Sequence, residues 1–240
     1  MATHRSRSGD AQRELQEAIK KLIVERGLHS GSPLPTETEL MRLLSVSRHP
    51  LREAVKALQA LGIVEIRHGL GTFVSAPSLA FLEAGLVFRT DLALGSDLKE
   101  IRDLVQVREV IEVGLVRQVM ALHRRADFGT LEEAVATMER QAESGLTAPD
   151  SDWQFHKTLY QPLGNEFVSE LLRVFWSVFN RMDARLTHTD ESPVHVARRH
   201  REILTALHDG DEQAMTLAVA EHFKGIDGRI ALTATETADG

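Results

Sequence analysis

The sequence predicts a mainly α-helical protein built from an N-terminal winged helix-turn-helix and a C-terminal all-α bundle of six or seven helices. Apolar residues recur at helical spacing through most of the 240 residues, which is the primary signal for amphipathic helices. The β-rich segments are short and confined to residues 63–66 and 72–74, as expected for a small wing. No β-rich segment follows the Ser- and Pro-containing stretch at 75–78, so the chain changes its structural character there.

These patterns divide the chain into two domains. We expect the winged helix-turn-helix over residues 10–76, a linker with a short helix over 77–96 and the helical bundle over 97–231. Residues 1–9 and 232–240 are expected to be disordered. A length of 240 residues suits two domains, and an apolar content of 42% is enough to bury a core.

Composition excludes several kinds of site and location. The chain has no cysteine, so disulfides and thiolate metal sites are excluded. No apolar run approaches the roughly 18 residues that a membrane span requires, and the first ten residues lack the apolar region of a signal peptide. We therefore expect a soluble cytoplasmic protein without a membrane partner.

The first predicted helix covers residues 10–26 and carries one apolar stripe. Its apolar positions follow the spacing i, i+3, i+4, i+7, i+8 of an amphipathic helix, and they are Leu15, Ala18, Ile19, Leu22 and Ile23. Gly27 then ends this helix.

A second, short helix follows a loop that contains Pro33 and Pro35. Thr36 and Glu39 fit the N-cap and N3 positions of a capping box, in which each side chain bonds the backbone N–H of the other residue. The residues that bury this helix are Leu40, Leu43 and Leu44.

The third helix is predicted to begin at Ser47, a favourable N-cap residue, and to tolerate Pro50 in its first turn. Its buried stripe consists of Leu51, Ala54, Val55 and Leu58. Another face carries basic residues at four-residue intervals, and these are Arg48, Arg52 and Lys56. Gly62 lies where a C-cap is expected, and the β-rich segments on either side of residues 67–71 form the wing.

The basic face of the third helix is suited to DNA, because the second helix of a helix-turn-helix can enter the major groove. Arg48 and Arg52 stand one turn apart, and arginine can donate two hydrogen bonds to guanine O6 and N7. Ser47 at the helix amino terminus suits a phosphate. The further predicted DNA contacts, from this helix and the wing tip, are His49, Lys56, His68 and Gly69. The alternative is an ordinary solvated helix face.

Charge is distributed unevenly between the two domains. The whole chain has a net charge of −7, whereas residues 1–77 carry 11 basic and 8 acidic side chains, a net charge of +3. The remainder has 17 basic and 27 acidic side chains, a net charge of −10. A basic domain joined to an acidic one suits a DNA reader, although chance variation between segments would give the same difference.

A characteristic set of residues is present in the N-terminal domain: Gly31, Leu34-Pro35, Glu37, Glu39-Leu40, Val46-Ser47-Arg48, Leu51-Arg52-Glu53-Ala54, Leu58, Gly62 and Gly69-x-Gly71-Thr72-Phe73-Val74. With these residues the segment 10–75 resembles the winged helix-turn-helix of the GntR family of bacterial transcription regulators. Thr38 departs from the pattern, since the family often has a DNA-contacting arginine there. The resemblance implies a DNA-binding regulator, by default a repressor released by its effector. We expect a homodimer on a pseudo-palindromic operator.

The second half of the chain is helix-periodic throughout. The predicted helices cover residues 97–124, 127–145, 150–161, 164–185, 194–208 and 211–230, preceded by a short helix near 80–90. Turn residues separate them at Gly145–Pro149, Gly164-Asn165 and Asp209-Gly210-Asp211. This pattern predicts a helical bundle.

Four residues of the bundle form a candidate metal site. Asp152 and His156 are four residues apart, on one face of a helix. His200 and His222 flank the turn at 209–211 at similar distances, so the two rings lie at the same height if the helices pack antiparallel. Three histidines and one aspartate suit Zn²⁺, Ni²⁺, Mn²⁺ or Fe²⁺, and ligand type alone does not choose among them. Zn²⁺ is the metal that we expect first. Since the chain has 11 histidines, the competing reading is ordinary surface histidines.

The same four residues match the metal ligands typical of the FCD domain, the ligand-sensing domain of the FadR-type GntR branch, so residues 95–230 resemble that domain. The resemblance implies a small carboxylate effector at the metal, although some members of this branch lack metal and bind acyl-CoA. Arg108 matches an arginine of the first sensing helix and is expected to pair with the carboxylate. A structural salt bridge with Glu112 is the alternative for Arg108. Asn165 and Arg181 are weaker candidates for effector contacts.

Two other functions are compatible with the metal site. A purely structural metal would leave sensing to another pocket. A metal-dependent enzyme would use the cation to activate water, with Glu109 or Glu112 as an imagined base, but this reading does not explain the winged domain. We therefore expect a regulator without enzymatic activity.

Overall fold

The computed structural model describes four stretches of the chain, residues 3–93, 98–123, 128–183 and 192–238. It contains two compact units, Met1–Phe81 and Leu82–Gly240. The predicted fold class is confirmed, because the first unit is a winged helix-turn-helix and the second is helical. Within the described residues, no helix combines the length and the apolar character that crossing a membrane would require.

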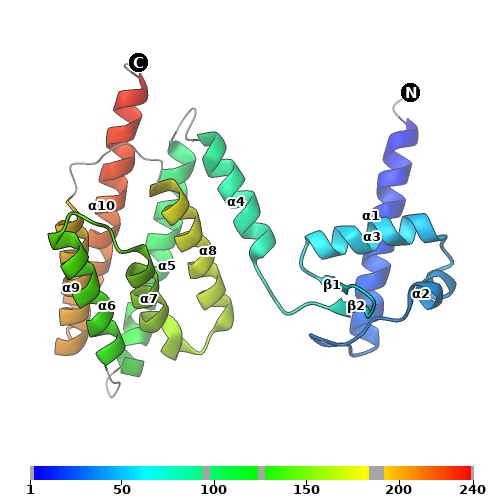
Figure 1. The fold of residues 1–240 in the computed structure, drawn as a ribbon, viewed down its shortest axis with the longest axis horizontal. Helices are drawn as coiled ribbons and strands as arrows, with labels where there is room; N and C mark the ends of the chain where they lie inside the picture. Colours follow the sequence, from blue (N-terminus) through cyan, green and yellow to red (C-terminus); the bar gives the residue numbers. More distant parts are fainter. Residues whose placement is uncertain (1–2, 94–97, 124–127, 184–191, 239–240) are drawn as a thin grey trace. The chain divides into compact units, whose positions relative to one another are not determined.

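The N-terminal unit packs its helices around one small core (Figure 1). Its elements are α1 (Thr3–Glu25), α2 (Glu37–Leu44), α3 (Arg48–Ala60), β1 (Val64–Arg67) and β2 (Gly71–Val74). Ile19 of α1 and Leu58 of α3 are both fully buried. The buried core residues are Leu15, Ile19, Ile23, Leu34, Leu40, Leu51, Ala54, Val55, Leu58 and Val64. This core holds one face of α3 and leaves the other face to solvent.

Local signals explain where these helices begin and end. Thr36 Oγ1 accepts a hydrogen bond from Glu39 N at 3.3 Å, and Glu39 Oε2 accepts one from Thr36 N at 2.9 Å. The predicted capping box is therefore confirmed. Ser47 is the N-cap of α3 as predicted, but its side chain makes no capping hydrogen bond. Gly62 follows α3 in the left-handed conformation, with φ of 69°, as expected for a glycine after a helix.

The wing is an antiparallel pair tied to the loop before α2. Strands β1 and β2 pair in the register Val64↔Val74, Glu65↔Phe73, Ile66↔Thr72 and Arg67↔Gly71. Gly69 in the connecting turn and Gly71 at the start of β2 adopt φ values of 75° and 116°, which glycine reaches without strain. The loop adds a bridge between Pro33 and Phe73, so the wing is braced on one side by residues that precede the helix-turn-helix.

The C-terminal unit is a bundle of long helices (Figure 1). They are α4 (Ala80–Ala93), α5 (Lys99–His123), α6 (Gly129–Glu143), α7 (Pro149–Tyr160), α8 (Glu166–Asp183), α9 (Pro193–Asp209) and α10 (Glu212–Ala238), with a short 3-10 helix η1 (Gln161–Leu163). Helix α10 packs against α5 and α9, and α6 packs against α7 and α9. The turn at Gly210, with φ of 71°, joins α9 and α10 as the predicted helical hairpin.

Helix ends differ from the predictions at both termini. Residues 3–9 belong to α1 and residues 232–238 belong to α10, where disorder was predicted. No proline interrupts either segment, and each residue that extends an existing helix adds one backbone hydrogen bond. The predicted helix ends at 97, 124, 127 and 185 lie outside the described residues.

Candidate metal centre and nucleic-acid interface

Three buried histidines meet at one point in the C-terminal unit. His156 lies on α7, His200 on α9 and His222 on α10, and one ring nitrogen of each lies within 4.8 Å of the others. Their exposed fractions are 3%, 0% and 6%. The hairpin turn at Gly210 explains part of this convergence, because it brings the rings of His200 and His222 to the same height with centroids 4.7 Å apart.

Asp152 points to the same centre from one turn earlier on α7. Its Oδ1 lies 2.9 Å from His200 Nε2 and 3.9 Å from His156 Nε2. Its Oδ2 accepts a hydrogen bond from Trp176 Nε1 at 2.7 Å. Burial opposes the ionisation of Asp152, but the surrounding histidines, His200 foremost, hold the pKa of Asp152 well below its usual range. The structure thus brings together the four predicted ligands.

Several ring nitrogens of these histidines have no hydrogen-bond partner and could bind a cation. His200 Nδ1 donates to the Val196 carbonyl oxygen at 2.8 Å, so Nε2 is the ring nitrogen that is left to face the Asp152 carboxylate. Both ring nitrogens of His156 and Nε2 of His200 are buried without a hydrogen-bond partner. Burial and the neighbouring rings hold the pKa of His222 well below its usual value, so this ring is neutral and able to bind a cation.

The donor set itself fits a divalent transition metal. Imidazole nitrogens and a carboxylate oxygen are common Zn²⁺ ligands, and Ni²⁺, Mn²⁺ and Fe²⁺ accept the same donor types. A cation between His200 Nε2 and the Asp152 carboxylate could accept a lone pair from each. The side chains present therefore fit a metal, and its identity and occupancy stay predictions.

Arg108 of α5 is a buried cation beside the histidines. It is 3% exposed, and its Nε donates to Glu112 Oε1 at 2.6 Å. Its guanidinium carbon lies 5.7 Å from the ring centre of Phe179 and 5.3 Å from that of Phe223. Burial opposes its charge, but Glu112 and Asp152 raise the pKa of Arg108. The salt bridge with Glu112 is thus present, whereas contact between Arg108 and an effector stays a prediction.

Glu112 connects Arg108 to the histidine group. Its Oε2 accepts a hydrogen bond from Tyr160 Oη at 2.8 Å and lies 3.3 Å from His156 Nδ1. Burial opposes its ionisation, but Arg108 and His156 hold the pKa of Glu112 well below its usual range. Burial and the Glu112 charge raise the pKa of Tyr160 well above its usual value. An ionised carboxylate therefore accepts from a protonated phenol in this cluster.

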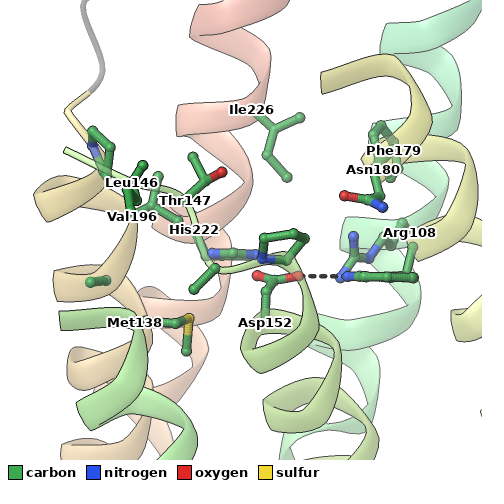
Figure 2. Close-up of a pocket in the computed structure, with 15 residues that line it drawn as sticks. Arg108, Met138, Leu146, Thr147, Asp152, Phe179, Asn180, Val196, His222 and Ile226 are labelled. Atoms are coloured by element: carbon green, nitrogen blue, oxygen red, sulfur yellow. Dashed lines mark hydrogen bonds between the residues drawn. The ribbon is translucent and has the colours of Figure 1, made fainter. Parts of the chain in front are cut away.

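A cavity of about 130 Å³ lies next to the candidate metal centre (Figure 2). Its polar lining includes Arg108, Thr147, Asp152, Asn180 and His222. Its apolar lining includes Met138, Leu146, Phe179, Val196 and Ile226. A small ligand in this cavity would meet a buried cation, two of the candidate metal ligands and several hydrocarbon side chains.

Two predicted effector contacts lie elsewhere. Asn165 is exposed and caps α8, since its Oδ1 accepts a hydrogen bond from Val168 N at 3.2 Å. Arg181 has a side chain that is 60% exposed and lies 3.9 Å from Asp91. The described lining of the cavity includes neither residue and has Asn180 instead. One position along a helix turns a side chain by about 100°, which is why Asn180 lines the cavity and Arg181 does not.

The predicted DNA-contacting residues are all exposed on α3 and the wing: Ser47, Arg48, His49, Arg52, Lys56, His68 and Gly69. Lys56 Nζ lies 3.0 Å from Glu53 on the same helix. Within the wing, Arg67 lies over the ring of Phe73, with 4.3 Å from its guanidinium carbon to the ring centre. Thr38, where the family often has arginine, is exposed on α2.

Glu37 of α2 links two arginines of this face. Glu37 Oε1 lies 2.7 Å from Arg48 Nε, and Glu37 Oε2 lies 3.0 Å from Arg52 Nε. Because both contacts use Nε, the terminal nitrogens of each guanidinium are left for other acceptors. This link was not predicted, since it joins two helices and no sequence spacing indicates it.

Two family models match the chain. The model for bacterial regulatory proteins of the gntR family matches residues 11–74, and the FCD domain model matches residues 103–225. The Uxu operon transcriptional regulator of Escherichia coli (strain K12) is 30% identical over 92% of this chain and 88% of its own length. The chain belongs to the GntR family.

Further relatives of this GntR protein are also regulators. A putative L-lactate dehydrogenase operon regulatory protein of Escherichia coli (strain K12) is 25% identical over 87% of this chain and 82% of its own length. The Glc operon transcriptional activator of the same strain is 27% identical over 80% and 77%, respectively. Among solved structures, Streptococcus agalactiae GntR has a TM-score of 0.59 and 26% identity, and covers 90% of this chain and 98% of its own. The predicted class, a DNA-binding transcription regulator and not an enzyme, is confirmed.

Proposed function

We propose that this GntR regulator binds a pseudo-palindromic operator as a homodimer and represses transcription until a small carboxylate binds at a metal-containing pocket of its C-terminal domain. The observation that carries the proposal is the convergence of one aspartate and three histidines beside a cavity that Arg108 also lines. Few convergent polar groups in an otherwise apolar cavity are typical of small-molecule sites. A metal buried away from any cavity would instead favour a purely structural role.

The side chains of the cavity supply two anchors for such an effector. Asp152 and the three histidines would hold the cation, which when bound supplies a Lewis acid for a carboxylate oxygen. Arg108 is held through Nε by Glu112, so its terminal nitrogens can donate to a carboxylate. Thr147 and Asn180 line the same cavity and can bond a hydroxyl or carbonyl group.

The name of one relative supports a small organic acid, and the name of another bears on the direction of regulation. One relative is named for an L-lactate dehydrogenase operon, and lactate carries the carboxylate and hydroxyl that these anchors suit. Another is named a transcriptional activator, so repression is the part of the proposal that needs a direct test. In either case the effector would act by favouring one of two pre-existing arrangements of the protein.

The first experiment is elemental analysis of the purified protein beside a His200→Ala/His222→Ala variant. We expect about one divalent ion per chain in the wild type and loss of that ion in the variant. Absence of metal from both proteins, even after reconstitution with Zn²⁺, Ni²⁺, Mn²⁺ and Fe²⁺, would refute the metal-containing pocket.

The second experiment separates a sensory metal from a structural one. Duplexes selected from a random library on the wild-type protein define its preferred sequence, and L-lactate, glycolate and hexuronates are then added with and without a chelator. We expect a carboxylate to change DNA affinity only while the metal is bound. A carboxylate effect that survives chelation, measured below the melting temperature, would assign the metal a structural role. A matched transcription assay tests repression.

A further inference from the structure

We propose that Glu112 is a positioning residue of the metal centre: it accepts the Nδ1 proton of His156 and so orients that ring toward the cation. The inference rests on the proposed function, because it requires a metal at the three histidines. It goes beyond the four ligands, since Glu112 lies on α5 and is not among them.

The first argument comes from the hydrogen-bonding needs of His156. Both nitrogens of this ring are buried without a hydrogen-bond partner. Its Nε2 faces Asp152 Oδ1 at 3.9 Å, and its Nδ1 faces Glu112 Oε2 at 3.3 Å. A ring that binds a cation through Nε2 must carry its proton on Nδ1. The carboxylate of Glu112 lies on that side to accept it.

The second argument is that the structure fixes the Glu112 carboxylate in place. Arg108 Nε donates to Oε1 at 2.6 Å, and Tyr160 Oη donates to Oε2 at 2.8 Å. Tyr160 also stacks on His156, with ring centroids 6.4 Å apart and planes 9° from parallel. The donors on both oxygens therefore hold the carboxylate against the ring that it would orient.

The arrangement follows a general rule of metal sites. A histidine ligand usually donates its other ring N–H to a carboxylate or carbonyl, which sets its tautomer and orientation. His200 already has such a partner, because its Nδ1 donates to the Val196 carbonyl at 2.8 Å. Glu112 would supply the equivalent partner for His156. The same carboxylate would then hold both a metal ligand and the anion-binding Arg108.

The test is the Zn²⁺ affinity of the full-length wild type, Glu112→Gln and Tyr160→Phe, measured by competition with a chromogenic chelator. A glutamine cannot accept on both sides, because one of its two terminal atoms is a donor. We expect Glu112→Gln to weaken Zn²⁺ binding about 10- to 100-fold. Tyr160→Phe leaves the carboxylate in place and is expected to have a smaller effect. Equal affinity in wild type and Glu112→Gln would overturn the inference.

A second pair of variants separates the effect of the carboxylate on the metal from its ion pair with Arg108, and each protein is titrated below its own melting temperature. Arg108→Met and Arg108→Met/Glu112→Gln differ only in the carboxylate, so we expect the double variant to bind Zn²⁺ about 10-fold or more weakly than the single one. We also expect the absorption spectrum of bound Co²⁺ to differ between the single and the double variant. If Glu112 had a purely structural role, the two spectra would be the same. Equal affinities and identical spectra would refute the inference. Failure of the wild type itself to bind metal would refute the proposed function instead.

Discussion

Both units of the molecule contain arginine–glutamate ion pairs, but the pairs are exposed in one unit and buried in the other. In the N-terminal unit, Glu37 contacts Arg48 and Arg52, whose side chains are 64% and 57% exposed. In the C-terminal unit, Arg108 and Glu112 have side chains that are only 4% and 1% exposed. Water screens the first cluster and not the second. The exposed arginines can therefore exchange Glu37 for another anion, as the predicted contact with DNA requires, whereas the buried pair is part of the framework of the cavity.

The difference in burial predicts different costs for breaking each cluster. An exposed ion pair contributes about 0–1 kcal/mol, because solvation and side-chain entropy offset the attraction. Removing one partner of a buried pair costs about 3–5 kcal/mol, because the other charge is left without compensation. Mutations in the first cluster should therefore change binding, and mutations in the second should change stability.

The largest expected effect is that of Arg108→Ala. It leaves Glu112 buried with one donor fewer, and we expect the free energy of unfolding of the C-terminal unit to fall by about 3–5 kcal/mol. Urea unfolding followed by tryptophan fluorescence reports this unit alone, since Trp153 and Trp176 are the two tryptophans of the chain. The control is Arg201→Ala, whose partner Glu139 is 39% exposed, with an expected loss of at most about 1 kcal/mol. Equal losses in the two variants would contradict the comparison.

The next effect is that of the metal on the same unit. A ligand that binds only the folded state at 100 times its dissociation constant stabilises it by about 2.7 kcal/mol. We therefore expect Zn²⁺ to raise the unfolding midpoint of the metal-free C-terminal unit by several degrees. The His200→Ala/His222→Ala variant should not respond. Amide hydrogen exchange in α3 should be unchanged when Zn²⁺ is added. Metal-dependent protection of α3 would show that metal binding also stabilises the N-terminal unit.

Smaller effects are expected for Arg48→Ala and Arg52→Ala. Each removes a candidate bidentate donor, so we expect a loss of about 1–3 kcal/mol in affinity for the preferred duplex, without a change in unfolding free energy. Lys56→Ala is the matched control on the same helix, expected to weaken binding to all sequences alike and to lower the salt slope by about 1. Preserved sequence preference in both arginine variants would argue against base contacts by this face.

The smallest effect is expected for Glu37→Gln. Loss of the carboxylate removes the link between two arginines and one negative charge near the DNA-binding face, so non-specific affinity should rise while discrimination falls. Stability should change by less than about 1 kcal/mol. Electrophoretic mobility shift assays with the selected duplex and a scrambled one measure the ratio of specific to non-specific affinity. An unchanged ratio would mean that Glu37 does not position the arginines.

Much of the fold was predictable because its signals are local. The capping box of Thr36 and Glu39 depends on residues three positions apart, and the wing turn depends on glycines with positive φ. The convergence of the candidate metal ligands was predictable for a related reason, since one helical turn joins Asp152 to His156 and one hairpin joins His200 to His222. The family resemblance singled out Arg108 as a functional residue. Sequence spacing alone could not decide whether its guanidinium pairs with Glu112 or with an effector.

The sequence by itself determined the helix-turn-helix, the wing, the helical bundle and the candidate ligands, because helix periodicity, caps and turn residues act over a few positions. Only the tertiary structure decided that Asn165 and Arg181 lie off the cavity, that Asn180 lines it, and that Glu37 and Glu112 each bridge separate side chains. Those outcomes depend on the rotation and packing of one helix against another. A shift of one residue turns a side chain by about 100°, and no local pattern specifies that phase between helices.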